Sequence, residues 1–136
     1  NIHVFALTET WISSNTTCAQ LFDAIPHGFI FISTPRLVSD SCTSSVVGGG
    51  TAFLTRVTRE PSPTFKSFEM SSVTMKLPHS KRTLYNIYRP PPSSAKSRLS
   101  VSFSQFLNDF RTLISSVSTT PHEFDITGDF NIHVDD

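Results

Sequence analysis

The polar residues best suited to chemistry stand where apolar, strand-like segments end. They are Glu9 in "ALTETW", Tyr88 in "LYNIYRPP", and Asp129 and Asn131 in "TGDFNIH". A carboxylate can bind a hard cation or act as a general base, and a phenol or an amide can donate a hydrogen bond to phosphate. Each residue alone also has an ordinary explanation, because strand-end acids are often solvated and D-x-N sequences are common in turns.

The segment that contains Asp129, residues 123–136, carries a row of metal-friendly side chains. Polar residues occupy its odd positions and apolar residues most even positions, which predicts a strand. In an extended strand Asp129 and Asn131 point the same way, about 6.6 Å apart. Asp129 and Asp135 would be about 20 Å apart, too far to share one cation. The row as a whole therefore cannot hold one cation. His133 could be a ligand or an acid, although a structural or solvent-facing role is favoured, and Asp135 is expected to be solvated.

The segments that would position these residues read as strands. They are residues 3–11, 28–33, 46–56, 65–77, 81–91 and 123–134. Pro90–Pro92 would end the fifth of these strands. Neither a Lys-Ser/Thr pair nor a helix follows Gly48–Gly50, so a tight turn or bulge is expected there instead of a phosphate-binding loop. Residues 58–64, "TREPSPT", predict a hairpin-type loop between strands.

The clearest predicted element is a helix over residues 103–117. Its apolar residues recur at intervals of three and four and form one face: Phe103, Phe106, Leu107, Phe110, Leu113, Ile114 and Val117. Ser102 and Gln105 predict a capping box at its start. A second, weaker helical pattern covers residues 19–25. Strands followed by a helix and a last strand predict a mixed α/β layered domain, in which this apolar face packs into the core.

The composition limits the partners and the location of the chain. Its 136 residues allow one domain, and 11 basic residues balance 11 acidic ones, so nucleic-acid binding would need a local basic face or a metal. No apolar run approaches the ~18 residues of a membrane span, so no membrane partner is expected. Cys18 and Cys42 lack metal-type spacing, which favours free thiols in a reducing, intracellular compartment.

The order of motifs resembles one known superfamily. "ALTETW", "GGGTAFLTR", "NIYRPP", a helix and "GDFNIH" follow one another as in the endonuclease/exonuclease/phosphatase superfamily. The wording of "YRPP" and "GDFNIH" is most similar to the apurinic-type endonuclease domain of non-LTR (LINE-type) retrotransposons. This resemblance implies an incomplete two-sheet α/β sandwich of the DNase I-like type, with mixed, mostly antiparallel strands and an outer helix near residues 103–117.

The resemblance also implies roles for the candidate residues. In that superfamily a divalent metal, Mg²⁺ or Mn²⁺, assists the attack of water on a phosphodiester. Glu9 would be the metal ligand, and Asp129 would be the general base that deprotonates the water. Asn131 would hold the phosphate or the water, and Tyr88 would donate its hydroxyl to a phosphate oxygen. Arg89, in "YRPP", would contact the substrate.

DNA is therefore the expected partner, and a nuclear location is expected if the substrate is chromosomal DNA. Several basic residues near "YRPP" could contact its phosphates or could form an ordinary solvated rim: Lys81, Arg82, Arg89 and Lys96.

The resemblance covers only the middle of the family domain, so residues 1–136 correspond to a partial domain truncated at both ends. An early asparagine motif would precede residue 1, and a further aspartate and a Ser-Asp-His motif would follow residue 136. We therefore expect this isolated chain to show no appreciable nuclease activity. The main hypothesis is a fragment of a Mg²⁺-dependent DNA-nicking endonuclease for target-primed retrotransposition. The alternatives are a non-catalytic retrotransposon-derived remnant or binding surface, and a superfamily member acting on phospholipids or inositol phosphates, which the "YRPP" context disfavours.

Overall fold

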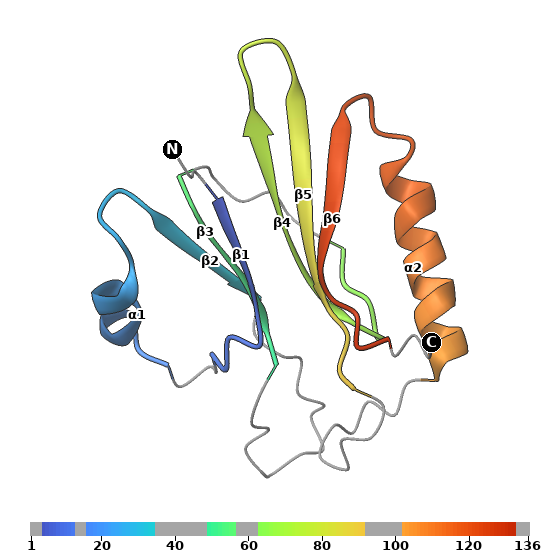
Figure 1. The fold of residues 1–136 in the computed structure, drawn as a ribbon, viewed down its shortest axis with the longest axis horizontal. Helices are drawn as coiled ribbons and strands as arrows, with labels where there is room; N and C mark the ends of the chain where they lie inside the picture. Colours follow the sequence, from blue (N-terminus) through green and yellow to red (C-terminus); the bar gives the residue numbers. More distant parts are fainter. Residues whose placement is uncertain (1–3, 13–15, 35–48, 57–62, 92–101, 133–136) are drawn as a thin grey trace.

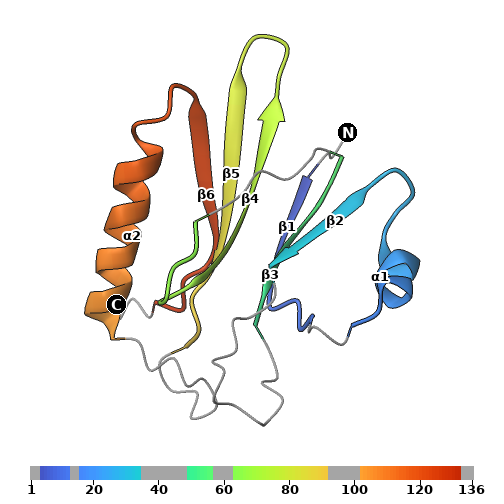
Figure 2. The ribbon, with the colours of Figure 1, turned by 180° about the vertical axis from the view of Figure 1, so that it is seen from behind.

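The computed structural model describes residues 4–12, 16–34, 49–56, 63–91 and 102–132. In chain order the elements are β1 (Val4–Thr8), α1 (Cys18–Ala24), β2 (Ile30–Thr34), β3 (Thr51–Thr55), β4 (Glu69–Lys76), β5 (Lys81–Tyr88), α2 (Phe103–Val117) and β6 (Glu123–Asp129). The strands form two three-stranded sheets, with α1 outside the first sheet and α2 outside the second (Figure 1 and, from behind, Figure 2). The predicted α/β class with two sheets is confirmed.

The first sheet, here called sheet A, has the strand order β1-β3-β2. Both outer strands run antiparallel to β3, so that Val4 and Ile30 flank Thr55 on opposite sides. The strand after β3 belongs to the other sheet, so the prediction of a hairpin between these two strands is wrong. The physical reason is that β4 finds its antiparallel partner in β5, with Glu69 opposite Tyr88.

The second sheet, sheet B, has the order β4-β5-β6. β4 and β5 are antiparallel, whereas β5 and β6 are parallel. Two parallel strands need a crossover connection, and α2 lies in the connection between them. Three pairings are thus antiparallel and one is parallel, in agreement with the expected mixed arrangement.

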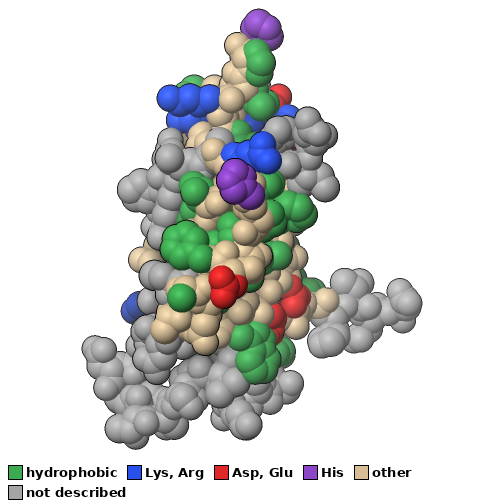
Figure 3. Space-filling model, turned by 90° about the vertical axis from the view of Figure 1, so that its left-hand side faces the viewer, with side chains coloured by type: hydrophobic (Ala, Val, Ile, Leu, Met, Phe, Trp, Pro, Cys, Tyr) green, Lys and Arg blue, Asp and Glu red, His purple; other side chains and the backbone are tan. Residues whose placement is uncertain are grey.

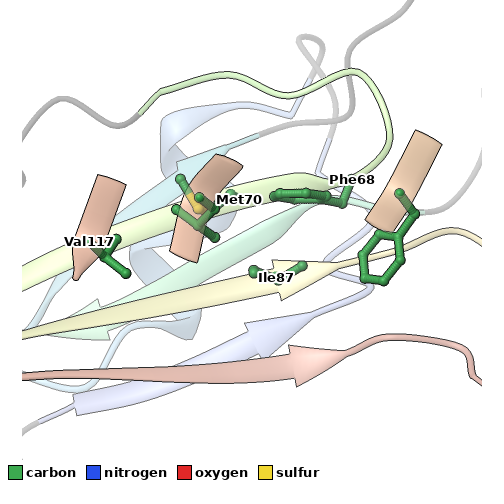
Figure 4. Packing of buried hydrophobic residues seen from close by; sticks show 6 residues of the cluster. Phe68, Met70, Ile87 and Val117 are labelled. Atoms are coloured by element: carbon green, nitrogen blue, oxygen red, sulfur yellow. The ribbon is translucent and has the colours of Figure 1, made fainter. Parts of the chain in front are cut away.

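Helix α2 closes the outer face of sheet B and has the predicted bounds. Phe68 and Met70 of the β4 segment and Ile87 of β5 pack with Val117 and its helix neighbours (Figure 4). The side chain of Ser102 accepts a hydrogen bond from the backbone N of Gln105 at 3.2 Å, as predicted. The side-chain amide of Gln105, however, donates to Asp109 at 2.8 Å, so the reciprocal half of the predicted capping box is replaced.

Helix α1 begins one residue before the predicted range and has a complete capping box. The hydroxyl of Thr17 accepts from the backbone N of Gln20, and the side chain of Gln20 accepts from the backbone N of Thr17. This reciprocal pair stabilises the start of a helix that is only 7 residues long. Neither described helix is long and apolar enough to cross a membrane.

The layer between the two sheets joins apolar and polar side chains. Ile32, Phe53 and Val73 form its apolar cluster. Asn86, which is 1% exposed, donates through Nδ2 to the carbonyl oxygens of Leu7 at 2.7 Å and Ala52 at 3.3 Å. Because Asn86 is in β5 and both acceptors are in sheet A, these hydrogen bonds hold the two sheets at a defined separation.

Candidate active site

The predicted site residues lie at strand ends on one edge of the two sheets. Glu9 directly follows β1, Tyr88 is the last residue of β5, and Asp129 is the last residue of β6. Tyr88 and Asp129 are register partners of two parallel strands, so the ends of β5 and β6 coincide. The ends of β1, β5 and β6 lie at the lower edge of the sheets in Figure 1. Three separate segments are thereby brought to the same place.

A hydrogen bond between the sheets joins two of these residues. The hydroxyl of Tyr88 donates to Oε1 of Glu9. Oε2 of the same carboxylate accepts from Nε1 of Trp11 at 3.0 Å. Tyr88 is 2% exposed, whereas Glu9 is exposed. The phenol is therefore fixed by burial, and the carboxylate it contacts faces solvent in an orientation set by two donors.

The backbone around Glu9 is unusual. Glu9 and Trp11 have φ angles of 54° and 56°, a left-handed conformation that non-glycine residues rarely adopt. The backbone N of Trp11 donates to the carbonyl of Gly49 at 3.0 Å, and Gly49 and Gly50 have φ angles of 84° and 89°. The pairing of β1 with the β3 segment thus continues beyond both strands, through backbone conformations that favour glycine at Gly49 and Gly50. The tight turn or bulge predicted at Gly48–Gly50 lies partly outside the described residues, because Gly48 is not among them.

Glu69 is part of this edge, and the sequence analysis did not identify it. This glutamate opens β4 opposite Tyr88 and is 5% exposed. Its Oε2 accepts a hydrogen bond from the backbone N of Gly50 at 2.5 Å, and the carbonyl of Gly50 accepts from the backbone N of Thr10, so Glu69 connects sheet B to the segment that follows Glu9. A signal was present, because Glu69 alternates with Ser71 and Val73, which places an acid on the inward face of the strand.

Asp129 and Asn131 form a turn instead of the extended pair that was predicted. The backbone N of Asn131 donates to Oδ1 of Asp129 at 3.0 Å, and its Nδ2 donates to the backbone carbonyl of Arg89 at 2.6 Å. Asn131 has a φ of 45°. The extended geometry is wrong because an aspartate carboxylate readily accepts from the backbone two residues on, and asparagine tolerates the left-handed region. The two side chains are consequently closer than strand spacing implies, at 3.3 Å from Nδ2 to Oδ2.

Gly128 provides the close approach that the sequence suggested before Asp129. It lies opposite Ile87 with a φ of 136°. A Cβ atom at this position would be 1.8 Å from the carbonyl oxygen of Ile87, which is a direct overlap with backbone. Glycine is therefore required for β6 to reach β5 and to place Asp129 beside Tyr88.

Arg89 has a different environment from the substrate contact that was predicted. It is 6% exposed, and its Nη1 donates to the carbonyl oxygens of Phe130 at 3.1 Å and Asn131 at 3.0 Å. Its guanidinium lies 5.3 Å and 5.0 Å from the ring centres of Phe103 and Phe106. The guanidinium of Arg89 is therefore buried between aromatic rings and backbone carbonyls, and its hydrogen bonds stabilise the segment that contains the Asp129–Asn131 turn.

Two of the other basic residues suggested for phosphate contact, Lys81 and Arg82, lie at the start of β5, away from this edge. Arg82 is near the opposite end of β5, where its Nη2 lies 2.5 Å from Oε2 of Glu123 and its Nη1 lies 3.5 Å from Oδ2 of Asp125. The hydrogen bond and charge of Glu123, followed by the charge of Asp125, raise the pKa of Arg82. Lys81 is its neighbour in the strand, and Lys96 and His133 lie outside the described residues.

The donor set at this edge suits a hard cation that keeps much of its water. Within the described ranges no three His, Cys, Asp or Glu side chains gather to hold a metal ion. Mg²⁺, however, commonly binds one or two protein carboxylates together with water and substrate phosphate. The exposed, pre-oriented carboxylate of Glu9 fits that mode of binding.

An apolar cavity of about 410 Å³ lies on the outer side of sheet A, next to α1. Its lining is mainly apolar: Leu7, Ile12, Leu21, Ile25, Phe31 and Leu54, with Glu9 and two threonines among the polar contributors. Hydrophobic side chains also gather on the surface of this side of the molecule (Figure 3). This cavity offers fewer polar groups to a phosphate than the edge described above.

In comparisons with known proteins, no protein family matches the chain, and no curated protein matches it significantly.

Proposed function

We propose that the chain is part of a divalent-metal-dependent endonuclease domain with a DNase I-like sandwich. The domain would belong to the endonuclease/exonuclease/phosphatase superfamily and be of the apurinic type found in LINE-type retrotransposons. Its substrate would be a phosphodiester of DNA, nicked for target-primed retrotransposition. One observation supports this most: Tyr88 bonds Glu9 across the sheets and is the register partner of Asp129.

Each residue of this edge has an atom suited to the proposed reaction. Glu9 would hold Mg²⁺ or Mn²⁺, which when bound supplies charge neutralisation at the phosphate. Asp129 would take a proton from the attacking water, and the two donors of Asn131 hold that carboxylate in one orientation. The hydroxyl of Tyr88 donates to Glu9 in the structure, and its single proton would have to turn from that carboxylate to a phosphate oxygen when substrate binds beside Glu9.

The most direct test of the proposed function is to measure metal binding by this chain, because the proposal requires Glu9 to be the metal ligand. Mn²⁺ added to isotope-labelled protein should broaden the amide signals near Glu9, Tyr88 and Asp129 by paramagnetic relaxation. Glu9→Gln should abolish that broadening while the rest of the spectrum stays unchanged. Broadening that is absent, or that survives Glu9→Gln, would contradict the metal site and with it the proposed function.

A nicking assay addresses cleavage itself. Supercoiled plasmid is incubated with the chain and Mg²⁺, and the conversion to open circles is measured. The sequence-based expectation is no appreciable nicking by this isolated chain. Metal-dependent nicking that Asp129→Ala abolishes would overturn that expectation and would support the endonuclease function directly.

A further inference from the structure

Trp11 is a large aromatic side chain displayed beside the candidate metal ligand. It is the only tryptophan of the chain and is 61% exposed. Isolated exposed apolar residues are common on protein surfaces and need no explanation by themselves. Trp11 differs because its ring is exposed and also held in place.

One hydrogen bond orients the Trp11 ring, and two features fix the backbone that carries it. Its indole Nε1 donates to Oε2 of Glu9 at 3.0 Å, and its backbone N donates to the carbonyl of Gly49 at 3.0 Å. Its φ of 56° is a costly conformation for a non-glycine residue, and such conformations cluster at functional sites. A side chain ordered before binding loses little conformational entropy when a ligand stacks on it.

The charge distribution makes an uncharged contact with DNA valuable at this edge. The chain has no net charge. Arg89, next to this edge, is buried against backbone carbonyls, and Arg82 is paired with acids near the other end of β5. Glu9 and Asp129 add negative charge where a phosphate would bind. Stacking can supply affinity there, because every nucleobase has a π face and stacking is insensitive to sequence.

We propose that Trp11 is a stacking platform for one unpaired nucleobase of the DNA strand, next to the phosphate that binds at Glu9. The inference rests on the proposed function for the position of that phosphate. The hydrogen bond between the indole and Glu9 links the two contacts, so the base and the phosphate are aligned by the same carboxylate. The ligand class is single-stranded or locally unstacked DNA.

Intrinsic fluorescence tests this directly, because Trp11 is the sole tryptophan. The chain is titrated with a thymidine oligonucleotide and, in parallel, with an abasic deoxyribose-phosphate oligomer of the same length. We expect saturable quenching of the indole emission by the thymidine oligonucleotide and little quenching by the abasic oligomer. Equal quenching by both oligomers, or quenching by neither, would overturn the stacking site.

Substitutions separate stacking from general binding. Trp11→Leu should weaken binding of a labelled thymidine oligonucleotide, followed by fluorescence anisotropy, by roughly 5- to 100-fold. Trp11→Phe, which keeps an aromatic face, should recover part of that loss. The matched control is Phe22→Leu on α1, because Phe22 is 72% exposed and outside the site, and it should leave affinity unchanged. Equal losses for Trp11→Leu and Phe22→Leu would contradict the proposal.

Failure of this inference is distinguishable from failure of the proposed function. Mn²⁺ broadening that depends on Glu9, without base-dependent quenching, would overturn the stacking site and leave the metal-dependent function standing. Base-dependent quenching without any Mn²⁺ broadening would support the stacking site and overturn the metal-dependent function. Glu9→Gln keeps an acceptor oxygen for the indole, so quenching should persist in that variant although metal binding is lost.

Discussion

The two faces of sheet B differ in what they bury. Its outer face packs on α2 through a continuous apolar cluster of Phe68, Met70, Ile87, Phe106, Leu113 and Val117. Its inner face meets sheet A with a smaller apolar cluster, next to the buried polar side chains of Asn86 and Glu69. The outer face contributes mainly hydrophobic stabilisation, which depends on area and little on direction.

The inner face fixes the orientation of the two sheets relative to each other, because its hydrogen bonds join specific donors and acceptors. Asn86 bonds two carbonyls of sheet A, and Glu69 bonds Gly50. These contacts set where Glu9 sits relative to Tyr88 and Asp129. Residues of the outer face therefore mainly stabilise the protein, whereas Asn86 and Glu69 of the inner face position the candidate site.

The largest expected effect comes from the outer face. Leu113 is 0% exposed in α2, and Leu113→Ala should lower the free energy of unfolding by about 2–5 kcal/mol through lost burial and a residual cavity. Urea denaturation measures this loss. Leu107→Ala on the same helix is the control, because Leu107 is 43% exposed and its loss should be much smaller. Similar losses at both positions would contradict the assignment of the apolar core.

A substitution at the junction of β5 and β6 should affect stability and the site together. Gly128→Ala places a Cβ against the backbone carbonyl of Ile87, and the φ of residue 128 is unfavourable for alanine. The substitution should lower the free energy of unfolding by roughly 2–4 kcal/mol. Gly28→Ala is the matched control, because Gly28 also has a positive φ but the nearest atom to its Cβ is 4.0 Å away. Thermal unfolding compares the two, and the overlap at Gly128 predicts the greater loss.

Glu69 tests whether the inner face controls the site. Glu69→Ala removes the acceptor of the Gly50 N–H and should lower the free energy of unfolding by about 1–3 kcal/mol. Glu69→Gln keeps an acceptor oxygen, so it should retain more of that stability. In folded protein, Mn²⁺ affinity should fall for Glu69→Ala and recover in Glu69→Gln, whereas Leu113→Ala should leave it unchanged. Unchanged affinity in Glu69→Ala would mean that Gly50 does not position Glu9.

The sequence predicted local structure well and the pairing of strands less well. The bounds of α2 followed from its seven apolar residues at helical spacing, a local pattern that tertiary contacts reinforced. The separation of β3 and β4 into different sheets had no local signal, because the loop between them reads like any polar connection. Strand pairing depends on partners distant in sequence, which periodicity alone does not identify.

The candidate site shows the same limit at the level of single residues. Motif order pointed to Glu9, Tyr88 and Asp129, and the structure places these three at one edge. The turn at Asn131 had a local signal, because D-x-N sequences are common in turns, but the alternating pattern favoured a strand. The burial of Arg89 was missed because it depends on contacts with residues about forty positions away. An arginine in "YRPP" reads as a surface cation until the carbonyls of the neighbouring segment are known.

The smallest effect is expected at the end of sheet B opposite the site. Arg82 is paired with Glu123 and Asp125 in an exposed position, and Arg82→Ala should leave stability almost unchanged, because solvent screens such pairs. These acids raise the pKa of Arg82, so its contribution is present below the ordinary pKa of arginine and is lost only as the pH rises through the folded value. Arg82→Ala should therefore unfold at the wild-type urea concentration throughout the neutral pH range, and wild-type stability should respond little to salt. A marked, salt-sensitive loss would show that the strand ends remote from the site also depend on directed polar contacts, which would weaken the contrast between the two faces.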